Sequence, residues 1–106
     1  MFKSSFRPSG GVSVIAEPGN CHNGSSDYLA TLIQAAKDCG ADAIKFQLFE
    51  PDHLSVPDYE WYKVYQEVVI PRDQWVRHFA LAKAVGLTVV AEVFDVVDPG
   101  VRVGTV

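Results

Sequence analysis

Four polar side chains lie at or near the ends of predicted strands, where together they could form the charged part of a functional site: Glu17, Lys45, Gln47 and Glu92. The alternative is a purely structural ion pair of Lys45 with Glu17 or Glu92. Because burial of a charged pair is costly, structure alone rarely selects one. The pattern therefore favours a functional site.

Alternating strand and helix patterns must position these side chains. Short runs rich in Val, Ile and Phe predict strands at residues 12–16, 43–48 and 88–94. Apolar residues at helical spacing predict helices at about residues 26–39 and 71–85. The β-α-β-α-β order predicts an α/β fold in which parallel strands are joined by right-handed crossovers.

The predicted helices carry recognisable end signals. Ser25 or Ser26 can cap the first helix, and Gly40 suits the left-handed position after it. We expect Pro71 at the first position of the second helix. The buried stripe of that helix is expected to be Trp75, Phe79 and Ala82, with Val76 and Ala80 flanking it.

Strand alternation separates a polar face from an apolar face on the second strand. Lys45 and Gln47 share the polar face, to which Glu17 also points, and the apolar face consists of Ile44, Phe46 and Leu48. If helices cover the apolar face, the polar side chains point to the other side of the sheet. In a β/α barrel that side is the interior, and barrel enzymes keep their chemistry at the carboxyl ends of the strands.

Composition excludes several functional classes. The chain has 106 residues, of which 48% are hydrophobic and 21% charged, and its net charge is −4. This is the composition of a folded protein without a basic field for nucleic acid or an anionic membrane. The two cysteines, Cys21 and Cys39, indicate free thiols of a reducing compartment. With no secretory signal in evidence, we expect a cytoplasmic protein.

A long connection follows the second strand and spans residues 49–70. Connections of this length at the carboxyl edge of a parallel sheet are often functional. We expect one short helix in it, near residues 58–67. The connection contains an aromatic group that could stack on a sugar or pack the loop onto the barrel rim, and packing is slightly favoured. The group is Tyr59, Trp61, Tyr62 and Tyr65.

The three histidines, His22, His53 and His78, are not at the spacing of metal ligands, so we expect no metal site in this chain. His78 is expected to be a surface or packing residue and His53 to be exposed to solvent. The G-x-G-x-x-G fingerprint of dinucleotide-binding proteins is absent.

Two motifs resemble those of the N-acetylneuraminate (sialic acid) synthase family. Residues 15–24 read I-A-E-P-G-N-C-H-N-G, where the family usually has I-A-E-x-G-x-N-H-x-G. Residues 36–47 read A-K-D-C-G-A-D-A-I-K-F-Q and are similar to the family's A-G-A-D-A-V-K-F-Q stretch. The resemblance covers about residues 12–95, and the two motifs at this separation are fairly specific.

The resemblance implies a (β/α)₈ barrel followed by a small antifreeze-like domain. Enzymes of this family condense phosphoenolpyruvate with an amino sugar such as N-acetylmannosamine, releasing phosphate and forming a nonulosonic acid. The resemblance also implies a homodimer and a divalent metal, Mn²⁺ or Mg²⁺, that polarises the sugar aldehyde. The histidines that bind this metal in the family lie on later strands.

The family's functional residues carry over to matching positions. Lys45 matches the lysine that binds phosphoenolpyruvate, and Gln47 matches its neighbour, which would orient a substrate by hydrogen bonds. Glu17 matches a glutamate that faces the sugar and could hold a hydroxyl group or assist proton transfer. His22 and Asn23 match the first βα loop, where we expect them to shape the site rather than perform the main chemistry.

Two positions depart from the family pattern. Cys21 replaces an asparagine, and A-E-V-F at residues 91–94 replaces the frequent S-T-P-F run, so Glu92 stands where a threonine contacts phosphoenolpyruvate. A carboxylate there would repel the anionic ligand unless it is protonated or paired with Lys45.

A complete barrel needs about 250 residues. We therefore interpret the chain as the N-terminal part of a barrel, incomplete and inactive on its own, with a lead-in at 1–11, barrel residues at 12–95 and an irregular tail at 96–106. Two other hypotheses stay open. Lys45 could be the Schiff-base lysine of an aldolase-type barrel, or the chain could be a non-catalytic fragment that associates with itself through its open sheet edge.

Overall fold

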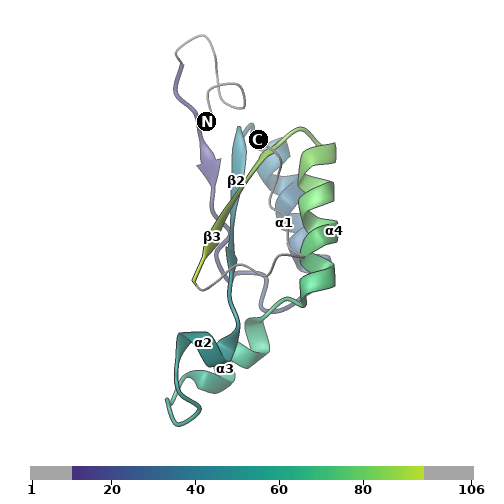
Figure 1. The fold of residues 1–106 in the computed structure, drawn as a ribbon. Helices are drawn as coiled ribbons and strands as arrows, with labels where there is room; N and C mark the ends of the chain where they lie inside the picture. Colours follow the sequence, from purple (N-terminus) through teal and green to yellow (C-terminus); the bar gives the residue numbers. More distant parts are fainter. Residues whose placement is uncertain (1–10, 95–106) are drawn as a thin grey trace.

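A three-stranded parallel sheet with strand order β1-β2-β3 forms the centre of the computed structural model, which describes residues 11–94. The strands are β1 (Ile15–Ala16), β2 (Ala43–Leu48) and β3 (Thr88–Val93), and the helices are α1 (Ser26–Asp38), α2 (Pro51–Leu54), α3 (Tyr62–Val68) and α4 (Arg72–Ala84). Helices α1 and α4 lie side by side on one face of the sheet, whereas α2 and α3 lie beyond the carboxyl end of β2 (Figure 1). The expected parallel β-α-β-α-β arrangement is confirmed.

The end signals of α1 act as the sequence predicts. The Ser25 hydroxyl accepts a hydrogen bond from the backbone N–H of Tyr28 at 3.1 Å, which satisfies one of the free donors of the first turn. Asp27 lies in the same turn, where the helix dipole favours a negative charge. Gly40 follows the helix with φ +85°, a left-handed conformation that glycine adopts without a Cβ clash.

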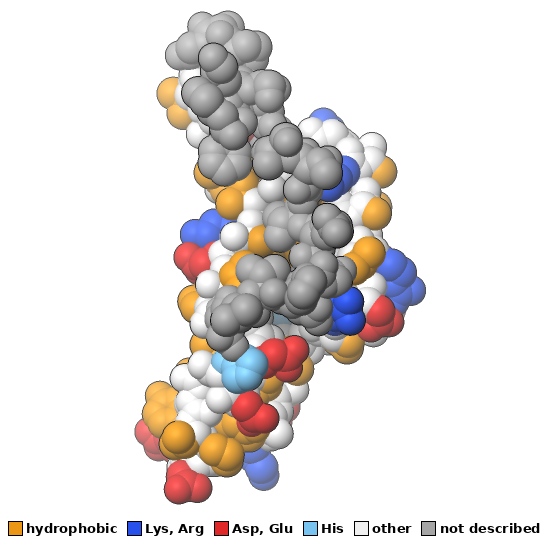
Figure 2. Space-filling view, viewed as in Figure 1, with side chains coloured by type: hydrophobic (Ala, Val, Ile, Leu, Met, Phe, Trp, Pro, Cys, Tyr) orange, Lys and Arg blue, Asp and Glu red, His pale blue; other side chains and the backbone are white. Residues whose placement is uncertain are grey.

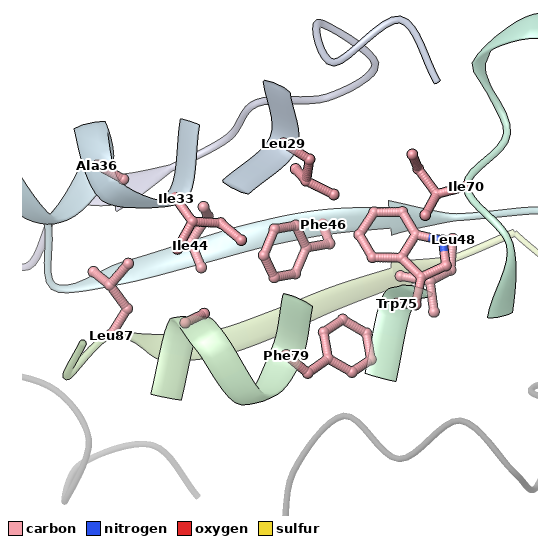
Figure 3. Packing of buried hydrophobic residues seen from close by; sticks show 11 residues of the cluster. Leu29, Ile33, Ala36, Ile44, Phe46, Leu48, Ile70, Trp75, Phe79 and Leu87 are labelled. Atoms are coloured by element: carbon pink, nitrogen blue, oxygen red, sulfur yellow. The ribbon is translucent and has the colours of Figure 1, made fainter. Parts of the chain in front are cut away.

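The hydrophobic core fills the space between the sheet and the two long helices (Figure 3). Phe46 of β2 is fully buried, and its ring centroid lies 5.3 Å from that of Trp75 and 5.6 Å from that of Phe79, both on α4. Leu29 and Ile33 of α1 are also fully buried. The apolar face of β2 therefore joins both helices to one core.

Strand β1 is shorter than predicted, because regular pairing begins only at Ile15 rather than at residue 12. Val12 is 79% exposed, so burial does not hold the first residues of the predicted strand against a neighbour. Val14 makes irregular contacts instead: its carbonyl accepts from the N–H groups of Asp42 and Ala43, and its N–H donates to the Asp42 carboxylate at 2.7 Å.

The buried face of α4 differs in part from the prediction. Trp75, Phe79 and Ala82 are buried as expected, but the flanking residues Val76 and Ala80 are exposed. His78 is buried on the same face of α4, because it follows Trp75 by three residues and precedes Ala82 by four. Its Nε2 lies 2.7 Å from the Ser26 hydroxyl, so this histidine also links α4 to α1.

The start of α4 also differs. Pro71 is the N-cap residue, with ψ 148°, rather than the first helical residue. Its carbonyl accepts hydrogen bonds from the N–H groups of Gln74 and Trp75, so Pro71 still begins the helix.

The connection after β2 contains two short helices, α2 and α3, instead of the single one predicted. Tyr65 packs against Phe49 and Tyr59, with ring centroids 6.2 Å away in both cases, and the Tyr62 hydroxyl contacts the Asp52 carboxylate. Three of the four aromatic residues therefore pack within the connection. Trp61 is 54% exposed, and this end of the molecule shows hydrophobic and acidic side chains side by side (Figure 2).

The boundaries predicted at 1–11 and 96–106 fall almost entirely outside the described residues. Among residues 11–94, no helix is both long and apolar enough to cross a membrane.

Candidate functional site

Three strand ends bring the predicted site residues together on the sheet face that α1 and α4 leave uncovered. Glu17 directly follows β1, Gln47 is the penultimate residue of β2, and Glu92 is the penultimate residue of β3. Gln47 and Glu92 are direct neighbours in the parallel register. Lys45 lies two residues before Gln47, so strand alternation places both side chains on the same face.

Glu17, Lys45, Gln47 and Glu92 form a connected group, here called the Lys45 cluster. Lys45 Nζ lies 3.5 Å from Glu17 Oε1 and 3.3 Å from Glu92 Oε2. Gln47 Nε2 donates to Glu17 Oε1 and to Glu92 Oε1, both at 3.3 Å. The structure thus shows that Glu92 is paired with Lys45, which is one of the two conditions expected for a carboxylate at this position.

The electrostatics of the cluster keep Lys45 charged. The hydrogen bond with Glu92 is the main cause that raises the Lys45 pKa above its ordinary value, and Glu17 adds to the effect although partial burial opposes it. The three charged side chains are 28% (Lys45), 47% (Glu17) and 39% (Glu92) exposed, so solvent can reach them. One ammonium between two carboxylates gives the group a net charge of −1 when both glutamates are ionised.

A protonated Lys45 does not favour the aldolase hypothesis. A Schiff-base lysine attacks a carbonyl group as the neutral amine and is normally activated by a lowered pKa. Here the carboxylates of Glu92 and Glu17 raise the pKa of Lys45 instead of lowering it. They keep Lys45 as an ammonium, which is the form of a lysine that can bind an anion.

His22 and Asn23 do not join the Lys45 cluster. His22 is 1% exposed, its Nδ1 accepts a hydrogen bond from the Gly24 N–H at 2.9 Å, and its ring meets the edge of Trp75. Burial is the main cause that lowers the His22 pKa, and electrostatic repulsion from His78 lowers it further. Asn23 is exposed and has φ 54°, in the left-handed region. That these residues shape the site through the loop stays a prediction.

The described residues do not fit a divalent metal ion. Among residues 11–94, no group of three or more His, Cys, Asp or Glu side chains could hold one. The two carboxylates of the Lys45 cluster both contact the Lys45 ammonium. A metal would have to displace this ammonium and find further ligands elsewhere.

A shallow apolar hollow lies between β1 and α1 and shares only Glu17 with the Lys45 cluster. Its lining includes Val14, Ala16, Leu32 and Ile44, and Glu17 is its one charged residue. Lys45, Gln47 and Glu92 do not line it, so we place the candidate site at the cluster. The two cysteines are free, as predicted, and the structure shows that both are exposed.

Sequence reasoning missed two polar features. The contact between Ser26 and His78 joins residues 52 positions apart, although the helical spacing of His78 from Trp75 could have indicated its burial. The side-chain oxygen of Asn20 is buried without a hydrogen-bond partner among the described residues, in the same loop as His22. No sequence pattern indicates that second feature.

Comparisons with known proteins agree with the motifs. Residues 32–99 match the NeuB family. Over 82 residues the chain is 30% identical to the uncharacterized protein MJ1065 of Methanocaldococcus jannaschii, covering 77% of this chain and 24% of that protein. Over 41 residues it is 51% identical to N,N'-diacetyllegionaminic acid synthase of Legionella pneumophila, covering 39% of this chain and 12% of the enzyme. The chain therefore corresponds to a quarter or less of the length of these relatives.

Solved structures give the fold. The chain superposes on the N-acetylneuraminic acid (sialic acid) synthetase of Leptospira borgpetersenii with a TM-score of 0.75 and 25% identity, covering 80% of this chain and 30% of that one. The superposition on the spore coat polysaccharide biosynthesis protein SpsE of Bacillus subtilis has a TM-score of 0.60 and 31% identity. It covers 84% of this chain and 25% of SpsE. The described residues form the N-terminal β-α-β-α-β portion of a (β/α)₈ barrel. By its motifs, its fold and its sequence match, the chain belongs to the NeuB family.

Proposed function

We propose that this chain supplies substrate-binding side chains to a phosphoenolpyruvate-dependent nonulosonic acid synthase, a transferase of carbohydrate biosynthesis that forms a carbon–carbon bond. The observation that carries the proposal is the Lys45 cluster at the carboxyl ends of three parallel strands in a NeuB-family chain. Legionaminic and pseudaminic acid synthases among the relatives support the same reaction class.

In the proposed reaction, C3 of phosphoenolpyruvate forms a bond to the aldehyde carbon of an amino sugar such as N-acetylmannosamine. Water adds at C2 and phosphate leaves. Lys45 would bind the phosphate or carboxylate of phosphoenolpyruvate as an ammonium, because the adjacent carboxylates keep it protonated. A positive charge held in place before binding stabilises the developing charge without reorganisation of solvent.

Glu17 and Gln47 are suited to the sugar. Both contacts of Glu17 with the cluster use Oε1, so Oε2 can accept a hydrogen bond from a sugar hydroxyl or take part in proton transfer. Gln47 directs its amide nitrogen to the carboxylates, and its carbonyl oxygen faces Gly19 in the first βα loop. That oxygen is an acceptor for a second hydroxyl group.

The cluster cannot bind a multiply charged anion by itself, because its own net charge is −1 with both glutamates ionised. We propose that further cationic groups and the divalent metal, Mn²⁺ or Mg²⁺, are held by residues outside the described part of the chain, and that the described residues alone are inactive. A homodimer and a cytoplasmic location belong to the same proposal.

A chimera tests the function. Residues 11–94 would replace the matching part of the Leptospira synthetase, and phosphate release from phosphoenolpyruvate with N-acetylmannosamine would be measured. We expect activity in the chimera and a loss of about 10³-fold in kcat/KM for Lys45→Ala. Lys83→Ala, which removes an exposed lysine of α4, is the matched control and should change little. Near-parental activity of the Lys45→Ala chimera would refute the assignment of Lys45.

A borohydride experiment with the same chimera addresses the aldolase hypothesis. A synthase of this kind forms no imine, so reduction in the presence of a carbonyl substrate should leave the mass of the protein unchanged. A covalent adduct on Lys45 would favour the aldolase hypothesis instead.

Self-association of the chain stays a separate prediction. Val14 and Ile15 at the β1 edge are 50% and 47% exposed. A monomer at every concentration in a sedimentation experiment would contradict pairing through this edge.

A further inference from the structure

Glu92 contacts both of its neighbours in the Lys45 cluster with different oxygens. Oε2 lies 3.3 Å from Lys45 Nζ, and Oε1 accepts the hydrogen bond from Gln47 Nε2 at 3.3 Å. Since Gln47 and Glu92 are register partners on adjacent strands, the backbone pairing of β2 and β3 fixes where this carboxylate can reach.

Glu17 contacts the same two side chains in another way. A single oxygen, Oε1, faces both Lys45 Nζ at 3.5 Å and Gln47 Nε2 at 3.3 Å. Glu17 is also the more exposed carboxylate, at 47% against 39% for Glu92. The two glutamates carry the same charge but have different geometric roles.

The direction of the Gln47 amide depends on these contacts. Two carboxylates on one side of the side chain require a donor there, so the amide nitrogen faces them and the carbonyl oxygen faces away. This oxygen lies 3.8 Å from the position that a Cβ on Gly19 would occupy. The carboxylates therefore determine which hydrogen-bonding group Gln47 presents to the first βα loop.

We propose that Glu92 is a positioning residue that uses its two oxygens to fix the directions in which Lys45 and Gln47 present their polar groups. The relevance to catalysis rests on the proposed function above. The positioning itself is a property of the folded chain and can be measured without substrate.

A matched pair of substitutions tests the proposal. In Glu17→Gln, the new carbonyl oxygen can still accept from both Lys45 and Gln47, because the original contacts used one oxygen. In Glu92→Gln, one of the two contacts must fail, because the new NH₂ group cannot accept a hydrogen bond. Both variants remove one negative charge, so the difference between them reports geometry.

The measurement is NMR on the isotopically labelled 106-residue chain. We expect Glu92→Gln to shift or broaden the side-chain NH₂ signals of Gln47 and to lower the Lys45 pKa, measured from its Nζ and Cε signals. Glu17→Gln should leave the Gln47 signals close to their original positions and lower the Lys45 pKa less. Equal effects of the two variants on both Gln47 and Lys45 would overturn the proposal.

Glu92→Asp covers the case in which Glu92→Gln fails to fold. It keeps the charge but shortens the reach, so it should disturb the Gln47 signals more than Glu17→Gln does while leaving the Lys45 pKa high. If Glu92→Asp disturbs Gln47 no more than Glu17→Gln does, the positioning role is wrong. Failure of the proposed function would appear differently, as an inactive chimera whose isolated chain still shows the expected NMR differences.

Discussion

The two faces of strand β2 show how one six-residue segment can serve both fold and site. Ile44, Phe46 and Leu48 point to the helices and are 0%, 0% and 9% exposed. Lys45 and Gln47 point the other way and contact two carboxylates, Glu92 of β3 and Glu17 directly after β1. Because side chains alternate along a strand, a substitution on one face can leave the other face nearly intact.

The energetic contributions of the two faces differ in kind. The covered face buries large apolar side chains, and burial of this type supplies most of the free energy of folding. The ion pairs of the uncovered face are partly exposed, and such pairs contribute little to stability because water competes for both charges. We therefore expect stability to depend on the first face and substrate binding on the second.

The largest expected effect on stability comes from Phe46→Ala. This change removes a fully buried ring that packs against Trp75 and Phe79, so we expect a loss of about 3–5 kcal/mol in the free energy of unfolding. Lys45→Ala, one position away, should change it far less, because water competes for the partly exposed ion pairs of Lys45. Urea denaturation followed by tryptophan fluorescence measures both. A similar loss in the two variants would contradict the separation of roles.

A smaller effect is expected at Gly24, in the loop that connects the Glu17 end of β1 to α1. A Cβ at Gly24 would lie 2.1 Å from the backbone oxygen of Glu67, and φ is +79°. We expect Gly24→Ala to destabilise the chain by about 2 kcal/mol or more, because the backbones would have to separate. Gly40 has a similar φ, +85°, but a Cβ added there would have no neighbouring atom within 4 Å. Gly40→Ala should therefore lower the free energy of unfolding by only about 1 kcal/mol.

The melting temperatures of the two glycine variants, measured by thermal unfolding, test this difference. A Gly24→Ala melting temperature equal to that of Gly40→Ala would show that the first βα loop is not held by close packing against the end of α3.

Two buried histidines on the covered side predict a pH dependence. Burial is the main cause that lowers the pKa of His22 and of His78 below the ordinary value of 6.5, with a smaller contribution from Arg77 at His78. Below about pH 6.5 the unfolded chain binds protons that the folded chain resists, so stability falls as the pH decreases toward the folded-state pKa values. Between about pH 5 and 7, the free energy of unfolding should change less steeply with pH in His22→Gln and in His78→Gln than in the parent chain.

The test is to measure the free energy of unfolding as a function of pH in the parent chain and in each of the two single variants. An unchanged slope in each of them would show that these histidines do not cause the loss of stability in acid.

The smallest expected effect lies on the uncovered face, at alkaline pH. The folded-state pKa of Lys45 is raised, mainly by the hydrogen bond with Glu92. Its contribution to stability is therefore fully present below the ordinary value of 10.5 and is lost as the pH rises through the raised value. Melting temperatures between about pH 9 and 12 should decline less steeply in Lys45→Gln than in the parent. A parallel decline in both would mean that the cluster is not formed in solution.

Much of the fold could be predicted from local pattern. The alternation of residues 43–48 identified β2 and its two faces, and the spacing of Leu29 and Ile33 identified the buried face of α1. Prediction was weaker where local signals compete. Residues 49–70 contain proline and aromatic residues without one clear period, and two helices formed where one was expected. The contact of His78 with Ser26 could not be predicted, because it joins two helices through residues 52 positions apart.

The sequence by itself determined the order of the three strands and the two long helices, the polar face of β2 and the motifs around Glu17 and Lys45, because these depend on residues close together in the chain. Only the tertiary structure decided that Glu92 contacts Lys45 and Gln47 with separate oxygens and that His22 lies against Trp75 instead of joining the cluster. The physical reason is that sheet register and helix packing set the distances between residues that are far apart in sequence, and hydrogen bonds depend on those distances to within tenths of an ångström.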